Sequence, residues 1–380
     1  MDAFFVEVER LARPELRGKA VVVGGAGPRG VVASASYEAR SRGVSSGMPM
    51  GQARRLCPHA VVVPPSHGDY SRVSDCVFEV IEGFTPRVEV MSVDEAFIDI
   101  AGLRLLHAGP LAVAEAIRAE IMREVGIPAS IGLATTKLLA KMASRDAKPD
   151  GIRIVAAGTE QEYLRSKPVR ALWGVGEATY ARLEELGVVT VGDLAAFPRS
   201  TLVRRLGDAL GGHLWDLASG RDDREVLPAG EARSISVERT YDTDLRDPGR
   251  LRRELLAHAD RLASRLRRAG LVAATVQLKV RYDDFTTITR SHTFDQPVST
   301  GRDLYRAALA LLDRTAAGTR PVRLLGIGTD GLVPAAEPRQ MDLAPRSWED
   351  LEEGVEEVRG RFGRDAVARA RLLDESPGDE

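Results

Sequence analysis

Hydrophobic residues recur at two different spacings along this chain of 380 residues, and together they predict a mixture of helices and strands. Between positions 111 and 125, Val113, Ile117 and Ile121 recur every four residues, which predicts a helix with one apolar face. The same reasoning predicts a helix over 70–84, a strand over 127–133, and a following helix that carries Lys137 and Lys141.

The C-terminal third shows its own regular order of patterns. Over 235–332 the order is strand, helix, strand, strand, helix, strand. The expected strands are 235–241, 273–282, 286–294 and 323–331, and the expected helices are 249–269 and 302–315. This order predicts a four-stranded sheet with two helices.

Two adjacent carboxylates, Asp94 and Glu95, separate two short β runs at 88–93 and 96–100. Adjacent side chains within a strand point to opposite faces, but at a tight turn both can project past the sheet edge toward one ligand. Carboxylates among apolar strand residues are costly to desolvate, and a hard divalent cation offsets that cost. Two such ions can clamp the attacking and leaving oxygens of a phosphoryl transfer. Taken alone, the pair is more simply explained as a polar hairpin turn.

Several further motifs decide between these two interpretations. They are Met1 to Phe5, Ser36 to Arg40, Gly43-Val44, Gly47 to Pro49, Ser130 to Gly132, Leu139 to Ser144, Ala147 to Gly151 and Leu172 to Gly176. Together with Ser92 to Ile100, these motifs resemble those of Y-family DNA polymerases, the translesion enzymes, and most closely the bacterial DNA polymerase IV branch. The resemblance extends from residue 1 to about residue 330. Several motifs in one order are far more specific than any single one.

The resemblance implies an α+β multidomain fold, namely a right-hand polymerase with palm, fingers and thumb plus a C-terminal little-finger domain. We expect the palm to be an antiparallel sheet covered by helices, and the thumb to contain a helix-hairpin-helix. The expected domains are palm 1–2 and 66–155, fingers 3–65, thumb 156–228, linker 229–234, little finger 235–335 and acidic tail 336–380.

The resemblance also implies the metal site. Asp94 would bridge two Mg²⁺ ions, and Glu95 would bind the catalytic one. A third carboxylate would lie on a first strand, two residues before Asp2, and this sequence starts at Met1, one position too late to contain it. A start upstream of Met1 and a homologue with impaired catalysis are two explanations. Asp2 could substitute as a ligand, but Asp favours helix caps, so we expect it to cap the following helix.

Phe4 and Phe5 match the family's nucleotide-binding aromatics. The resemblance implies that Phe5 stacks under the deoxyribose and leaves no room for a 2′-hydroxyl. Both residues could instead be ordinary core aromatics, and for Phe4 this alternative is a fair competitor.

Tyr37 and Arg40 are three residues apart on a predicted helical turn, so they share a face. An Arg on that face can bind triphosphate oxygens bidentately. The resemblance adds Ser34 as a hydroxyl and Lys148 as a point charge from the palm. The structural alternative is a surface Arg packed over a Tyr ring.

Gly174 and Gly176 match the helix-hairpin-helix, in which backbone N–H groups approach a DNA phosphate at a helix N-terminus. In the little finger, basic residues lie on or beside the predicted strands, where alternation would place several on one sheet face. These candidates for salt-sensitive contacts to duplex phosphates are Arg233, Arg239, Lys279, Arg281 and Arg290.

The charge distribution separates the little finger from the tail. The formal net charge is -2, but 231–335 carries 18 Arg and Lys against 13 Asp and Glu, whereas 336–380 carries 7 Arg against 13 acids. Within the tail, Gln340, Met341, Asp342 and Leu343 resemble the short peptide that docks bacterial polymerases on the sliding clamp. Apolar residues at helical spacing over 347–373 predict a helix.

We therefore expect a template-directed DNA polymerase of the translesion type, which adds dNTPs to a primer 3′ end by two-metal phosphoryl transfer without proofreading. The alternative is a DNA- and clamp-binding homologue with impaired catalysis. Two cysteines imply no disulfide framework, and no apolar run or leader pattern predicts a membrane association. We expect a cytoplasmic monomer whose partners are primer-template DNA, dNTP and the clamp.

Overall fold

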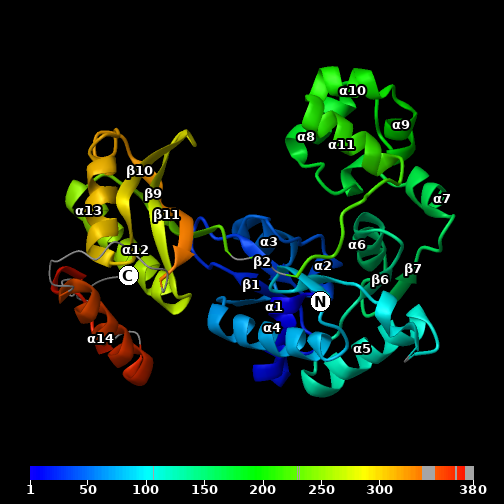
Figure 1. Cartoon of the computed structure of the whole chain (residues 1–380), viewed down its shortest axis with the longest axis horizontal. Coiled ribbons are helices and arrows are strands. Elements are labelled where there is room, and N and C mark those ends of the chain that lie inside the picture. Colours follow the sequence, from blue (N-terminus) through cyan, green and yellow to red (C-terminus); the bar gives the residue numbers. More distant parts are fainter. Residues whose placement is uncertain (106, 229, 231, 336–346, 364–365, 373–380) are drawn as a thin grey trace. The chain divides into compact units, whose positions relative to one another are not determined.

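The computed structural model describes residues 1–380 except 106, 229, 231, 336–346, 364–365 and 373–380 (Figure 1). The chain divides into two compact units. Unit 1 contains Met1–Ala26 and Gly30–Gly230, and unit 2 contains Gly27–Arg29 and Glu231–Glu380. Each unit has its own hydrophobic core, so each is described by itself.

The first 65 residues of unit 1 contain a small sheet that the sequence patterns did not predict. Valine-rich strands form it in the order β2-β1-β3, with β1 antiparallel to β2 and parallel to β3. Valine favours strands because its branched side chain packs well on a pleated surface. The elements of this part are α1 (Phe4–Ala12), β1 (Val21–Gly24), β2 (Val32–Ala35), α2 (Tyr37–Arg40), α3 (Met50–Leu56) and β3 (Val61–Val63).

The next part of unit 1 contains the predicted acidic hairpin. Strands β4 (Val88–Ser92) and β5 (Glu95–Ile98) pair antiparallel around a turn at Val93 and Asp94, which confirms the predicted hairpin. The other elements are α4 (His67–Glu82), α5 (Pro110–Glu124), β6 (Ile131–Leu133), α6 (Lys137–Asp146) and β7 (Ile152–Ile154). The predicted apolar face of α5 is also confirmed, because Val113, Ile117 and Ile121 are all buried.

The expectation of one antiparallel palm sheet is wrong. The hairpin is a separate two-stranded sheet, and β6 pairs in parallel with β7, a strand that the sequence patterns did not indicate. No described strand lies between β5 and β6, so each of these strands has hydrogen-bonded strand neighbours on one side only.

The remainder of unit 1 is helical. Its helices are α7 (Glu160–Arg165), α8 (Glu177–Glu184), α9 (Val191–Ala196), α10 (Arg199–Leu206) and α11 (Asp208–Ala218). Leucines from these helices form a separate core, in which Leu183, Leu194 and Leu202 are fully buried.

Unit 2 confirms the predicted order of strands and helices. Its antiparallel sheet has the strand order β10-β9-β11-β8, and two helices pack on one face. The elements are β8 (Ser234–Leu245), α12 (Pro248–Arg268), β9 (Leu271–Tyr282), β10 (Thr287–Val298), α13 (Gly301–Leu312) and β11 (Val322–Pro334).

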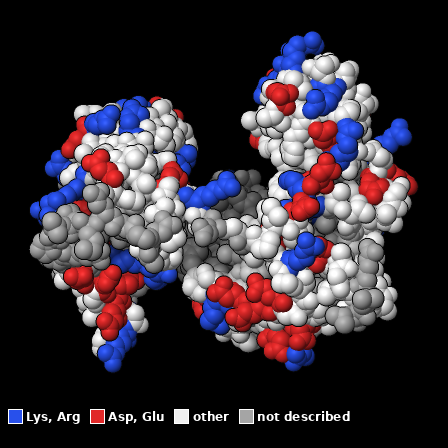
Figure 2. Space-filling view, in the orientation of Figure 1, with Lys and Arg blue, Asp and Glu red and all other residues white. Residues whose placement is uncertain are grey.

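Helix α14 (Ser347–Phe362) is joined to the rest of unit 2 through Glu352, which is buried and accepts hydrogen bonds from Arg267, Arg369 and the Gly301 N–H. Acidic side chains gather along this helix (Figure 2). The predicted clamp-binding residues Gln340 to Leu343 lie outside the described residues. No helix among the described residues is both long and apolar enough to cross a membrane.

Candidate active site

The turn between β4 and β5 places the two predicted carboxylates at the end of the hairpin. Asp94 accepts a hydrogen bond from the Ser92 hydroxyl at 2.8 Å, and Glu95 Oε2 lies 2.7 Å from the Lys141 ammonium of α6. Partial burial raises the pKa of Glu95, but the hydrogen bond and charge of Lys141, together with the charge of Lys148, lower it overall. The carboxylate is therefore ionised at neutral pH, as metal binding requires.

Residues from the start of the chain reach the same place. The Met1 amino group donates to the Asp94 carbonyl at 2.6 Å, and Lys148 donates to the Met1 carbonyl at 3.1 Å. Burial lowers the pKa of the Met1 amino group, and the charge of Lys148 lowers it further. Segments around residues 1, 94 and 148 are thus held together by hydrogen bonds.

The expectation that Asp2 caps the following helix is wrong. Helix α1 has Ala3 at its N-cap and no side-chain cap. Instead, the buried Asp2 carboxylate accepts hydrogen bonds from the Ser130 hydroxyl at 2.6 Å and from the Asp150 N–H at 2.8 Å. A buried carboxylate needs hydrogen-bond donors, and these two long-range partners supply them.

The carboxylates at the turn suit one of two kinds of divalent-cation site. Among the described residues, no group of three or more His, Cys, Asp or Glu side chains is placed to hold a metal ion. Mg²⁺, however, is commonly held by one or two carboxylates with substrate phosphates completing its coordination. Asp94 and Glu95 at one turn fit this second type of site, and no third ligand from the protein is assigned.

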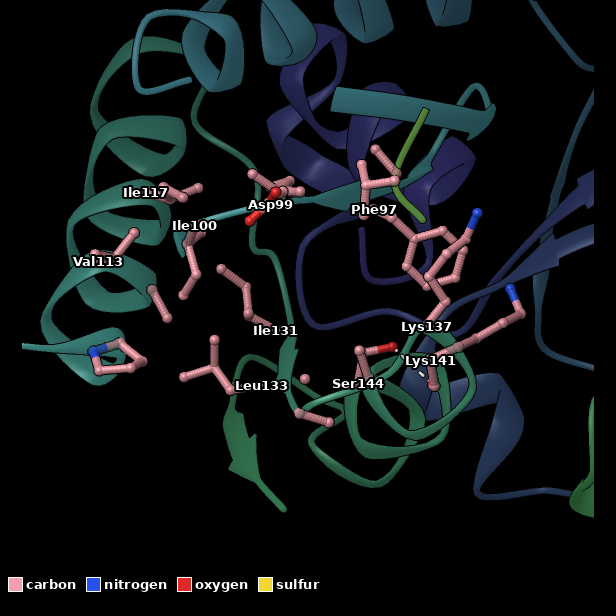
Figure 3. A pocket seen from close by; sticks show the side chains of 18 of the residues that line it. Phe97, Asp99, Ile100, Val113, Ile117, Ile131, Leu133, Lys137, Lys141 and Ser144 are labelled. Carbon is pink, nitrogen blue, oxygen red and sulfur yellow. Dashed lines mark hydrogen bonds between the residues drawn. The ribbon is translucent and has the colours of Figure 1, made fainter. Parts of the chain in front are cut away.

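A cavity of about 950 Å³ adjoins the hairpin. Its charged end is lined by Asp94, Glu95, Lys141 and Lys148. Its other end is mainly apolar, and Figure 3 shows Val113 and Ile117 of α5, Ile131 and Leu133 of β6, and Ile100 there, with Asp99 beside them. The acidic pair therefore lies beside a space large enough for part of a substrate.

The two aromatic candidates have different environments. Phe4 is buried in the core of unit 1, as the alternative interpretation expected. Phe5 is only half-buried, and its ring stacks on Tyr70 with centroids 4.3 Å apart. Tyr70 is itself fixed, since its hydroxyl donates to Glu9 at 2.6 Å. A rigid ring with one partly open face can form one wall of a sugar site.

Tyr37 and Arg40 lie on one face of the short helix α2, as the spacing predicted. The Arg40 guanidinium lies 5.1 Å from the centre of the Tyr37 ring, and its Nε donates to the Ala35 carbonyl at 2.8 Å. The Tyr37 hydroxyl is buried beside the Asp2 carboxylate. Burial raises its pKa, and the charge of Asp2 raises it further. Ser34 is buried on the adjacent strand β2.

Gly174 and Gly176 lie where the sequence predicted, immediately before a helix. Gly174 has φ +96°, a backbone conformation that favours glycine, and Gly176 is the N-cap of α8. Both glycines are exposed, so the N–H groups at the start of α8 can be approached from solvent.

The predicted basic residues of unit 2 do not all share one sheet face. Lys279 and Arg281 alternate with buried residues and lie on the face without helices. Arg239 and Arg290 stand in register with the buried residues Val280 and Leu278, so they belong to the opposite face. The alternation of side chains therefore brings together two of the predicted residues, while Arg233 precedes β8.

Sequence reasoning assigned no role to Lys141, although the structure places it on Glu95. A usable signal was present, because Lys137 and Lys141 are one helical turn apart and follow the acidic hairpin. Figure 3 shows both lysines on α6, with Lys137 beside Phe97 of β5. Their partners on the hairpin could not be identified from spacing alone.

Comparison with protein families finds three matched regions. Residues 1–145 match the impB/mucB/samB family, residues 232–343 match the C-terminal domain of that family, and residues 170–222 match the thumb domain of DNA polymerase iota.

The chain is also similar to curated proteins named DNA polymerase IV. It is 46% identical to that of Streptomyces coelicolor over 94% of this chain and 74% of the relative. It is 39% identical to that of Dehalococcoides mccartyi over 98% of this chain and 95% of the relative. It is 43% identical to that of Halorhodospira halophila over 90% of this chain and 96% of the relative.

Among solved structures, a Y-family DNA polymerase chimera of Dbh and Dpo4 matches with a TM-score of 0.78 and 25% identity, over 88% of this chain and 97% of the other. An insertion ternary complex of Dbh DNA polymerase matches in fold with a TM-score of 0.64 and 24% identity, over the same shares. These matches confirm the expected α+β polymerase fold class.

Proposed function

Because this chain belongs to the impB/mucB/samB family of Y-family translesion DNA polymerases, which are nucleotidyltransferases, we propose that it adds dNTPs to a primer 3′ end by two-metal phosphoryl transfer. The observation that carries this proposal is the position of Asp94 and Glu95. They lie together at a hairpin turn, beside a cavity and facing two lysines.

Each residue of the turn has a distinct part in this proposal. Asp94 would hold both Mg²⁺ ions, and Glu95 would hold the one nearest the primer. When bound, the two ions would lower the pKa of the primer 3′-hydroxyl and stabilise the charge on the departing pyrophosphate. Lys148, which lies on the same side of the cavity, would neutralise charge on the triphosphate.

The nucleotide would be oriented by residues of the first 40 positions. Arg40, supported by the Tyr37 ring, would bind triphosphate oxygens, and the Tyr37 and Ser34 hydroxyls would add hydrogen bonds. Phe5, held by its stacking on Tyr70, would exclude a ribose 2′-hydroxyl. Phe4 would support that ring from the core.

Primer-template DNA would be held through its phosphates. The exposed backbone around Gly174 and Gly176 would bind one strand, and the open sheet face with Lys279 and Arg281 would follow the duplex. We further propose that the chain acts as a cytoplasmic monomer that docks on the sliding clamp through Gln340 to Leu343. We also propose that incorporation takes place without proofreading.

Single-nucleotide primer extension tests the proposal. The wild-type chain should extend a primer with dNTPs and Mg²⁺, and a chelator should stop it. Glu95→Ala should remove incorporation while leaving primer-template affinity nearly unchanged, because Glu95 is assigned to metal and not to DNA. Incorporation by Glu95→Ala at the wild-type rate would end the assignment of this site.

A further inference from the structure

Trp173 lies at the junction between the helical part of unit 1 and the acidic hairpin. Its half-buried ring is 5.8 Å from the ring of Phe97 on β5. Two cations lie over the indole: the Lys141 ammonium is 5.4 Å and the Arg224 guanidinium 4.4 Å from its centre. Aromatic faces attract cations at such distances.

Lys141 is shared between Trp173 and the proposed metal site. The same ammonium that lies over the indole is 2.7 Å from Glu95 Oε2. A metal ion that binds Glu95 must therefore compete with Lys141 for the carboxylate. When the metal ion displaces Lys141 from Glu95, the indole remains as a second partner for the ammonium.

Two segments of the helical part contact α6. The first is the segment between α7 and α8, in which Trp173 lies under Lys141 of α6 and directly precedes Gly174 of the proposed DNA-binding hairpin. The second is the segment after α11, in which Asp222 accepts a hydrogen bond from the Leu138 N–H at 2.9 Å and is paired with Arg224.

A second contact fixes the segment after α11 a few residues later. Glu89 of β4 accepts from the Leu227 N–H at 2.9 Å and from the Lys137 ammonium. Trp173 and the segment after α11 therefore both contact elements that adjoin Glu95.

We propose that Trp173 is a positioning residue that acts through Lys141 to set how readily Glu95 binds metal. When Glu95 leaves Lys141 to bind the metal ion, the indole ring still contacts the Lys141 ammonium. This contact lowers the free energy needed to separate the Glu95–Lys141 ion pair. This inference rests on the proposed role of Glu95 as a metal ligand.

The chain contains a matched control for this test. Trp215 is also half-buried and also lies under an arginine, with the Arg221 guanidinium 4.6 Å from its ring centre. Its indole N–H donates to the Phe197 carbonyl at 3.0 Å, within the helical part and away from the hairpin. Trp173→Leu and Trp215→Leu therefore remove the same kind of side chain and the same kind of cation contact.

The main measurement is the Mg²⁺ concentration that gives half-maximal incorporation. Trp173→Leu should raise it by about 3- to 30-fold, which is the range expected for loss of one cation–aromatic contact. Trp173→Phe keeps an aromatic face and should fall between this variant and the wild type. Trp215→Leu should leave the value unchanged. Thermal melting of all variants checks that each is folded.

A double-mutant cycle tests whether the effect passes through Lys141. Lys141→Met removes the shared charge, so adding Trp173→Leu in that background should not change the Mg²⁺ requirement further. Equal Mg²⁺ requirements for Trp173→Leu and Trp215→Leu, or additive effects of the Lys141 and Trp173 changes, would overturn the inference.

The failure of this inference can be told apart from failure of the proposed function. If Glu95→Ala is as active as the wild type, the metal-ligand assignment itself is wrong. If Glu95→Ala is inactive but Trp173→Leu behaves like Trp215→Leu, only the inference fails. Calorimetric titration of Mg²⁺ into the complex with dNTP and a dideoxy-terminated primer-template gives a readout without turnover. There, too, Trp173→Leu should bind Mg²⁺ more weakly than Trp215→Leu.

Discussion

Two ion pairs in different units of the molecule have nearly the same local geometry. Glu95 and Lys141 in unit 1 are 2.7 Å apart with side chains 46% and 31% exposed. Glu238 and Lys279 in unit 2 are 2.8 Å apart with side chains 47% and 36% exposed. Partly exposed pairs of this kind contribute little to stability by themselves.

The surroundings of the two pairs are what differ. Glu238 on β8 and Lys279 on β9 flank Gly326 of β11 on the open sheet face, and the other face of this sheet packs into the hydrophobic core of unit 2. Glu95 and Lys141 instead line a cavity of about 950 Å³, together with further lysines and carboxylates that include Lys148 and Asp94. The comparison teaches that an ion pair indicates function through what it adjoins, and not through its own distance or exposure.

The largest effect expected in the nucleotide site is on sugar choice. Phe5→Ala should reduce the preference for dNTP over rNTP by on the order of 10- to 100-fold, because it opens space beside the 2′ position. The measurement is the ratio of kcat/KM for the two nucleotides. Phe84→Ala removes another half-buried aromatic of the same core and should leave the ratio unchanged. A ratio that stays constant in Phe5→Ala would make Phe5 a core residue only.

The triphosphate assignment predicts an effect on nucleotide affinity. Arg40→Ala should raise KM for dNTP by about 10-fold or more, since hydrogen bonds from a charged donor to a phosphate are lost. Arg42→Ala, an exposed arginine two residues later, is the control and should keep the wild-type KM. The same KM for both variants would remove Arg40 from the site.

A smaller effect is expected in unit 2, where the contacts are only to phosphates. The double change Lys279→Ala and Arg281→Ala should weaken primer-template binding and lower the slope of log affinity against log salt by about 2. Arg239→Ala with Arg290→Ala removes the same charge from the opposite sheet face. If that control pair weakens DNA binding as much, net charge and not the open face determines affinity.

The two regions also differ in how far they could be predicted. The strands and helices of unit 2 follow the predicted order, because a sheet with one buried face leaves a clear alternation in the sequence. In β9, for example, buried Val276, Leu278 and Val280 alternate with Gln277 and Lys279. Short strands such as β1 and β7 lack enough residues to show such a period, and they were missed.

The site was predictable where residues are neighbours in the sequence. The turn at Asp94 and Glu95 and the shared face of Tyr37 and Arg40 follow from spacing alone. The partners of Asp2 did not, because Ser130 and Asp150 are far away in the chain and no local pattern connects them. The same reason kept the contact between Lys141 and Glu95 from being foreseen.

The most direct test of the account uses the two matched ion pairs. Glu95→Gln and Glu238→Gln each remove one carboxylate charge from a pair with a lysine, and single-nucleotide incorporation is then measured at saturating DNA. We predict that Glu95→Gln loses at least about 100-fold in kcat, the scale of losing one preorganised electrostatic group. Glu238→Gln should keep the wild-type rate. Equal rates for the two variants would contradict the claim that the hairpin carboxylates form the catalytic site.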